Sequence, residues 1–112
     1  MTMFYREKGV AGTVASVAVP GLTSASTIDL VIVGNTSVPD PATGKLADWP
    51  LDQVKVYYRL DGGALVQVGT TKTPADVISW FSRMSKAGIL VANPNTATPF
   101  TATFSKFAVT AP

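Results

Sequence analysis

The sequence predicts an all-β protein, an antiparallel β-sandwich of jelly-roll-like type with one short helix near residues 74–86. Val, Thr and Ala make up 42 of the 112 residues, and Val and Thr are β-branched residues that favour strands. Short apolar runs between Gly, Pro, Asn and Asp clusters are typical of sandwiches and barrels. The length suits one domain, so we expect a single β-sandwich over residues 1–112, with residues 1–8 as an N-terminal arm.

Two strands are expected in the first third of the chain. The first runs from Thr13 to Val19 and ends at Pro20-Gly21, a strong turn signal. The second, residues 27–33, is apolar at nearly every position. Such a run predicts a central strand with both faces covered.

A β-hairpin is the clearest element of the sequence. Residues 53–60 and 64–68 are expected to pair across a three-residue loop, Asp61-Gly62-Gly63, with a left-handed glycine forming a bulge. This loop length places Tyr58 opposite Val66, so that apolar side chains face each other across the pair.

The alternation along residues 54–60 separates two faces of this hairpin. Val56 and Tyr58 belong to the apolar face, whereas Lys55, Tyr57 and Arg59 share the other. We therefore expect Tyr57 to lie on a polar, solvent-exposed face.

The remaining elements follow from capping and turn signals. Thr73 suits a helix cap, Pro74 suits the first helical position, and Gly88 suits the end of the helix. Strands are expected after it at residues 89–92 and 100–110. The long segment 34–52 is interpreted either as a functional loop or as a crossover between sheets held by Trp49 and Leu51.

Composition excludes most catalytic chemistry. The chain has no Cys and no His, which removes thiolate sites, His-dependent triads and most catalytic zinc sites. Asp40, Asp48 and Asp52 are close in sequence, but their spacing matches no calcium loop. We expect no enzyme activity, no catalytic residues, no metal site and no cofactor.

Charge is scarce in one part of the chain. Between Gly9 and Gly44 the only charged residues are Asp29 and Asp40. A small domain cannot bury so long a segment completely, so its surface is either neutral and Thr/Ser-rich or covered by a partner. Under the second interpretation, the candidate partner-contact residues are Phe4, Tyr5, Val38 and Trp49.

Other partner classes receive less support. The net charge is only +2, and no run of basic residues is present, so we expect no nucleic-acid binding. No apolar run reaches the length of a membrane span, and the charged start lacks the apolar region of a signal peptide. We therefore expect no membrane association. We also expect that the chain is made in a host cytoplasm.

Half of the chain resembles the final strands of concanavalin-like jelly rolls of the lectin and glucanase type. The matching stretches are residues 54–63, 87–91 and 104–109. The chain departs from this family because it is shorter and lacks the acidic motif of the glucanases. The resemblance implies a sandwich fold and leaves a carbohydrate-binding module as the alternative function, with a glycan bound by Trp49, Tyr57, Asn93 and Asn95.

The main functional hypothesis is a structural subunit of a phage or virus particle, either a capsid decoration protein or a tail component. Such a protein acts by packing against copies of itself or against a shell or tail protein. Its expected location is the virion.

Overall fold

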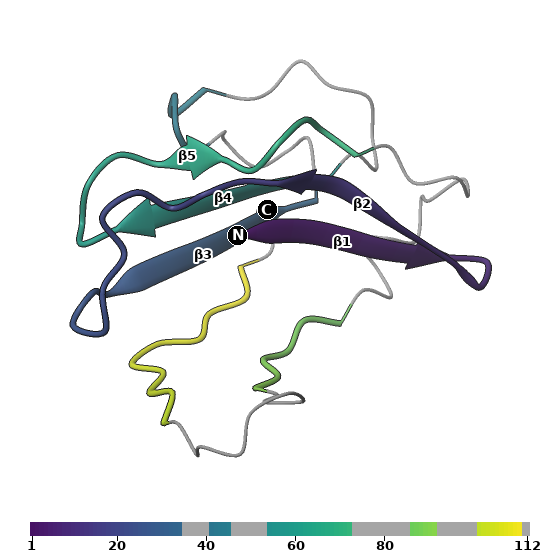
Figure 1. The fold of residues 1–112 in the computed structure, drawn as a ribbon. Coiled ribbons are helices and arrows are strands. Elements are labelled where there is room, and N and C mark those ends of the chain that lie inside the picture. Colours follow the sequence, from purple (N-terminus) through teal and green to yellow (C-terminus); the bar gives the residue numbers. More distant parts are fainter. Residues whose placement is uncertain (35–40, 46–53, 73–85, 92–100, 111–112) are drawn as a thin grey trace.

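The computed structural model describes residues 1–34, 41–45, 54–72, 86–91 and 101–110, and the regular structure of these residues is entirely β-strand. Figure 1 shows two antiparallel sheets. One pairs β1 (Thr2–Glu7) with β2 (Val10–Ser16); the other has the order β3 (Ile28–Val33), β4 (Lys55–Leu60), β5 (Val66–Gln67). The all-β prediction is confirmed. The sandwich arrangement stays a prediction, and the helix expected near residues 74–86 lies outside the described residues, apart from residue 86.

The N-terminal segment is a paired strand, whereas the sequence interpretation treated residues 1–8 as an arm. Lys8 and Gly9 have φ values of +49° and +82°, the left-handed pair that closes a tight hairpin. The turn returns the chain along β1, so that residues 2–7 pair with β2. The strand β2 begins three residues before the expected start at Thr13 and ends at Ser16.

A bulge interrupts the first hairpin. Met3 pairs with Ala15, but Phe4 pairs with Thr13, which leaves Val14 as an extra residue on β2. As a result Val14 and Ala15 are both half-buried although they are adjacent in the strand. Val14 packs against the hydrophobic core.

The register predicted for the second hairpin is confirmed. Tyr58 pairs with Val66, and the amide of Val68 donates to the carbonyl of Val56 at 2.8 Å. Asp61 and Gly62 have φ values of +49° and +72°, and the amide of Gly63 donates to the carbonyl of Leu60 at 2.9 Å. The chain therefore reverses at Asp61 and Gly62, a two-residue turn in place of the three-residue loop expected from the sequence. One additional residue between this turn and β5 keeps Tyr58 opposite Val66.

Strand β3 is an edge strand of the sheet within the described residues, so the prediction of a central strand is wrong. It pairs with β4 along one side, and the sheet order places no described strand on the other. Leu30 and Ile32 are 61% and 69% exposed. An unbroken apolar run does not distinguish a strand covered on both faces from an edge strand with one uncovered apolar face.

The expectation of a solvent-exposed Tyr57 is also wrong. Its exposed fraction is 2%, and that of the neighbouring Tyr58 is 7%. Because successive side chains of a strand point to opposite faces, both faces of β4 are covered at its centre. Tyr57 lies between Val31 of β3 and Gln67 of β5, which pair with it from either side.

The hydrophobic core lies between the first hairpin and the β4–β5 side of the second sheet. Met3, Tyr58 and Val68 are its buried members. Partly buried side chains surround them: Met1, Val14, Val17, Val19, Val54 and Val56. The first hairpin therefore covers the core face of β4. The face of β3 on the same side of the sheet lies beyond the edge of the core.

The strands expected near the C-terminus are not formed in the described residues. Segments 86–91 and 101–110 are drawn as irregular traces without arrows in Figure 1, and the chain bends at Ser105. All ten residues of 101–110 are exposed. An extended chain becomes a strand only when an edge accepts its backbone hydrogen bonds, and no described strand of this chain does so here.

Candidate functional site

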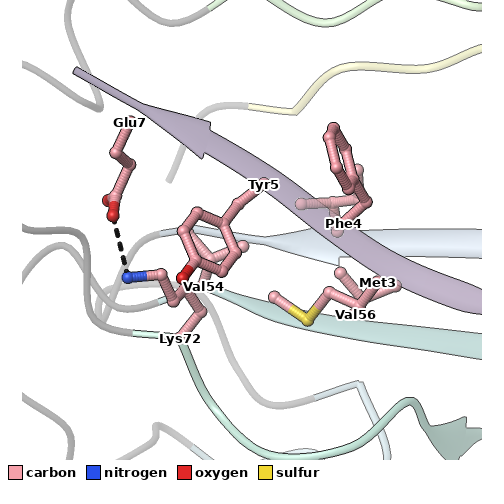
Figure 2. Close-up of a pocket in the computed structure, with 8 residues that line it drawn as sticks. Met3, Phe4, Tyr5, Glu7, Val54, Val56 and Lys72 are labelled. Atoms are coloured by element: carbon pink, nitrogen blue, oxygen red, sulfur yellow. Dashed lines mark hydrogen bonds and ion pairs between the residues drawn. The ribbon is translucent and has the colours of Figure 1, made fainter. Parts of the chain in front are cut away.

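A hollow of about 280 Å³ lies between β1 and the second sheet (Figure 2). Its apolar part contains Met3, Phe4, Ile32, Val54 and Val56, and its polar end contains Glu7, Tyr5 and Lys72. The mixture of an apolar surface and one polar end is a usual feature of sites that accept a side chain or a small molecule.

The alternation of β1 aims one set of side chains at the second sheet. Met3 is buried, while Tyr5 and Glu7 are half-buried. Gly12 pairs with Tyr5, and a Cβ atom at Gly12 would lie 2.5 Å from the Tyr5 hydroxyl oxygen. The missing side chain at Gly12 thus leaves the space that the Tyr5 ring occupies.

An ion pair closes the polar end of the hollow. Lys72 Nζ donates to Glu7 Oε2 at 3.0 Å, and the two side chains are only 21% and 23% exposed. The same ammonium group lies 4.5 Å from the centroid of the Tyr5 ring, within the range of a cation–π interaction. Backbone hydrogen bonds between Val54 and Lys72, at 2.8 and 2.9 Å, hold Lys72 in place.

The opposite side of the hollow continues into an exposed apolar surface. Ile28, Leu30 and Ile32 alternate along β3 and share one face; we call them the β3 strip. They are 37%, 61% and 69% exposed. Phe4, which is 63% exposed, lies with Ile32 along the hollow, so the strip and the hollow form one surface.

The β3 strip lies on the core side of its sheet. Leu30 pairs with Tyr58 and Ile32 pairs with Val56, and both β4 residues belong to or contact the core. Full burial of one such side chain is worth about 1.5–3 kcal/mol. The strip is therefore a part of the core surface that the first hairpin leaves uncovered.

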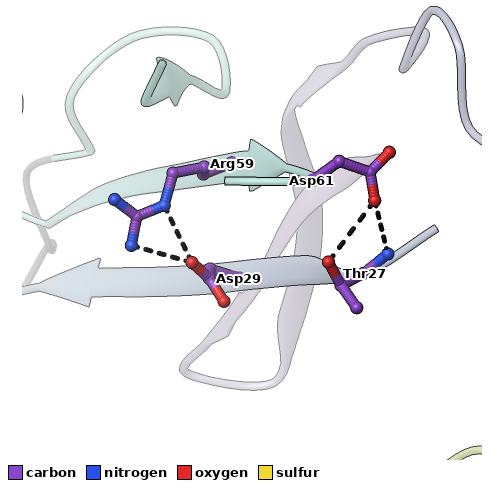
Figure 3. A network of polar contacts seen from close by, with 4 residues as sticks. All are labelled: Thr27, Asp29, Arg59 and Asp61. Atoms are coloured by element: carbon purple, nitrogen blue, oxygen red, sulfur yellow. Dashed lines mark hydrogen bonds and ion pairs between the residues drawn. The ribbon is translucent and has the colours of Figure 1, made fainter. Parts of the chain in front are cut away.

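The charged side chain of β3 lies on the other face. Asp29 Oδ2 accepts a hydrogen bond of 2.8 Å from Arg59 Nε, and Nη2 of the same guanidinium lies 2.8 Å from this oxygen in an ion pair (Figure 3). Just before the strand begins, Asp61 Oδ1 accepts a hydrogen bond from the Thr27 amide at 2.7 Å. These contacts fix β3 against β4 and leave its strip side without a charge of its own.

The candidate contact residues divide into three groups. Phe4 and Tyr5 both line the hollow. Tyr57 is buried, so its ring offers no platform for a sugar in this structure. Val38, Trp49, Asn93 and Asn95 lie outside the described residues.

Sequence reasoning missed the β3 strip, Glu7 and Lys72 as parts of this surface. The apolar run of residues 28–33 was a signal for the strip, but it was interpreted as interior. No local pattern points to Glu7 and Lys72, because the contact joins positions 65 residues apart.

The described part of the chain contains no group of three His, Cys, Asp or Glu side chains arranged to hold a metal ion. In the same residues no helix is long and apolar enough to cross a membrane. The residues that line the surface offer apolar contact next to the Glu7–Lys72 ion pair.

Comparison with known proteins gave no matching family model, no matching curated protein and no matching solved structure. The resemblance to concanavalin-like domains stays a prediction from the sequence.

Proposed function

We propose that this chain is a non-enzymatic structural subunit that acts by packing against copies of itself. The observation that carries the proposal is the β3 strip, together with the exposed ring of Phe4. Solvent-exposed apolar surface of this kind, continuous with a core, is typical of protein–protein contact sites. The scarcity of charge between residues 9 and 44 supports the same function.

A phage or virus particle is the setting we propose, with the chain as a capsid decoration protein or a tail component in the virion. A small domain without cysteine or histidine suits a role that needs only packing. Neighbouring capsid or tail genes would support this setting, whereas neighbouring glycosidase domains would count against it.

Self-association is tested by light scattering and sedimentation velocity from micromolar to millimolar concentration. The wild-type chain is expected to form oligomers, and Leu30→Asp is expected to be monomeric because it places a charge in the β3 strip. Val10→Asp is the matched control, since Val10 is 68% exposed on β2, away from the strip. Circular dichroism checks that both variants fold.

Two results would overturn the proposal. One is a wild-type chain that stays monomeric over the whole concentration range. The other is a Val10→Asp variant that dissociates as completely as Leu30→Asp, because the effect would then be independent of the strip.

A further inference from the structure

We propose that residues 101–110 of one copy pair as an added strand with the outer edge of β3 in a second copy. This inference rests on the proposed function and names the contact through which copies associate. It is built on two features of the described residues. One is a strand edge without a partner strand, and the other is an exposed apolar segment that belongs to neither sheet.

The first feature is the outer edge of β3. Its inner edge pairs with β4 from Ile28 to Val33, and none of the described residues pairs with its outer edge. An uncovered strand edge presents a row of amide and carbonyl groups to which another chain can add. In this chain the edge also borders the apolar β3 strip.

The second feature is segment 101–110. Its sequence predicts a strand, yet within the described residues it makes no backbone hydrogen bond with any strand. Phe104, Phe107 and Val109 are 53%, 56% and 71% exposed. The segment therefore exposes the apolar side chains of a strand, and it would have to straighten at the bend at Ser105 to join an existing edge.

The two features match in length and in chemistry. The six residues of β3 offer an edge of about 20 Å at 3.3 Å per residue, and the ten residues of the segment would span about 33 Å as a strand. Lys106 is the only charged residue of 101–110, and Asp29 is the only one of β3. An antiparallel register that places Lys106 opposite Asp29 therefore pairs opposite charges.

This register also fits the aromatic side chains. Phe107 falls opposite Ile28, at the end of the β3 strip, and Phe104 falls opposite Val31 on the other face. Aromatic side chains opposite aliphatic ones are favourable cross-strand pairs. Positions 104 and 107 have opposite parity along the segment, so each face of β3 then receives one ring.

A second copy is the occupant we infer because the segment of the same chain does not lie on this edge. Two copies that exchange the segment form a closed, two-fold symmetric pair in which each element is used once per copy. Each copy contributes six residues of β3 and ten of the segment, which approaches the roughly 20–30 residues per side of a standard interface.

Engineered disulfides test the register, because the chain has no cysteine of its own. Ser105 falls opposite Leu30 in the proposed pairing. Single variants Leu30→Cys and Ser105→Cys are mixed and oxidised mildly, and the products are mapped by peptide mass. The expected product is a dimer linked between positions 30 and 105.

A control mixture contains Ala11→Cys, at an exposed position of β2, in place of Leu30→Cys. It is expected to give much less disulfide-linked dimer. A second pair, Ile32→Cys with Thr103→Cys, repeats the test if Leu30→Cys does not fold.

The outcomes separate this inference from the proposed function. Wild-type oligomers without a 30–105 or 32–103 link would overturn the strand pairing and leave the proposed function standing. A double variant Leu30→Cys/Ser105→Cys that closes within one chain at high dilution would also overturn it, because the segment would then pair with its own β3. A monomeric wild-type chain would overturn both.

A charge variant gives an independent measurement. Lys106→Glu places like charges opposite each other and is expected to raise the Kd of the dimer about threefold. Lys86→Glu makes the same charge change at another exposed position and is expected to leave the Kd unchanged. Equal effects of the two variants would contradict the register.

Discussion

Glu7 and Lys72 form an ion pair with 3.0 Å between Oε2 and Nζ, although 65 residues separate them in the sequence. Glu7 is the last residue of β1, and Lys72 follows the second hairpin, so the contact joins the two sheets. The Tyr5 ring under the ammonium group adds a second attraction at the same point. The pair therefore fixes the distance between the sheets at the polar end of the hollow.

A double-mutant cycle with Glu7→Gln and Lys72→Met is expected to give a coupling energy of about 1 kcal/mol. Urea unfolding of the four proteins measures it. The Asp29–Arg59 pair is the control: its side chains are 53% and 41% exposed, so water and salt weaken its attraction more. A coupling for Asp29–Arg59 as large as that for Glu7–Lys72 would contradict the role we assign to burial.

Asp61 combines a left-handed backbone with a carboxylate that holds the start of β3. Its φ is +49°, and its Oδ1 accepts from the Thr27 amide and, at 3.4 Å, from the Thr27 hydroxyl. Asp61→Ala loses the acceptor and strains the backbone, so the free energy of unfolding should fall by about 2 kcal/mol.

Asp61→Asn is the matched variant, since asparagine tolerates positive φ and keeps an acceptor oxygen. We expect it to cost less than about 1 kcal/mol. Thermal unfolding compares the two variants, and equal losses would contradict the roles that we assign to the acceptor oxygen and to the backbone angle.

Gly69 approaches the first hairpin too closely to accept a side chain. Its φ is +68°, and an added Cβ would lie 2.3 Å from the Cβ of Ala15. Gly69→Ala should therefore destabilise the protein by about 3 kcal/mol, from backbone strain and overpacking together.

Gly9→Ala separates these two causes. Gly9 has a similar φ of +82° but nothing within 4 Å of an added Cβ, so only the backbone term remains, about 1 kcal/mol. Chemical denaturation of both variants measures the difference, and equal losses would mean that the contact with Ala15 relaxes freely.

Two aromatic truncations test the assignment of interior and surface. Tyr57 is 2% exposed and Phe4 is 63% exposed. Tyr57→Ala is expected to cost about 3–4 kcal/mol and Phe4→Ala less than about 1 kcal/mol in the monomer. Unfolding of dilute protein gives both values. If Tyr57→Ala lowered the free energy of unfolding only slightly, Tyr57 would again be a candidate for binding a glycan.

The register of the second hairpin could be predicted from the sequence because its signals are local. The loop length Asp61-Gly62-Gly63, chosen from the parity of the flanking apolar residues, was sufficient to place Tyr58 opposite Val66. By contrast, the first hairpin depends on Lys8, a residue without a strong turn preference, so the strand at residues 2–7 was not expected.

The surface around β3 could be predicted only in part. Phe4 and Tyr5 were chosen from the sequence and do line the hollow. The exposure of Leu30 and the burial of Tyr57 depend instead on how far the first hairpin extends over the second sheet. That extent is a property of tertiary packing, which residue periodicity does not encode.

The contact between Gly69 and Ala15 has a consequence for the natural variation of this chain. The backbone angle at position 69 favours glycine. A change in side-chain volume at this contact can therefore occur only at position 15. A side chain longer than a methyl group there would push the end of the second hairpin away from β2. Among sequences that share this fold, we therefore expect both positions to change slowly and together. Glycine at position 69 with a small residue at position 15 should remain recognisable in relatives whose overall sequence identity is low.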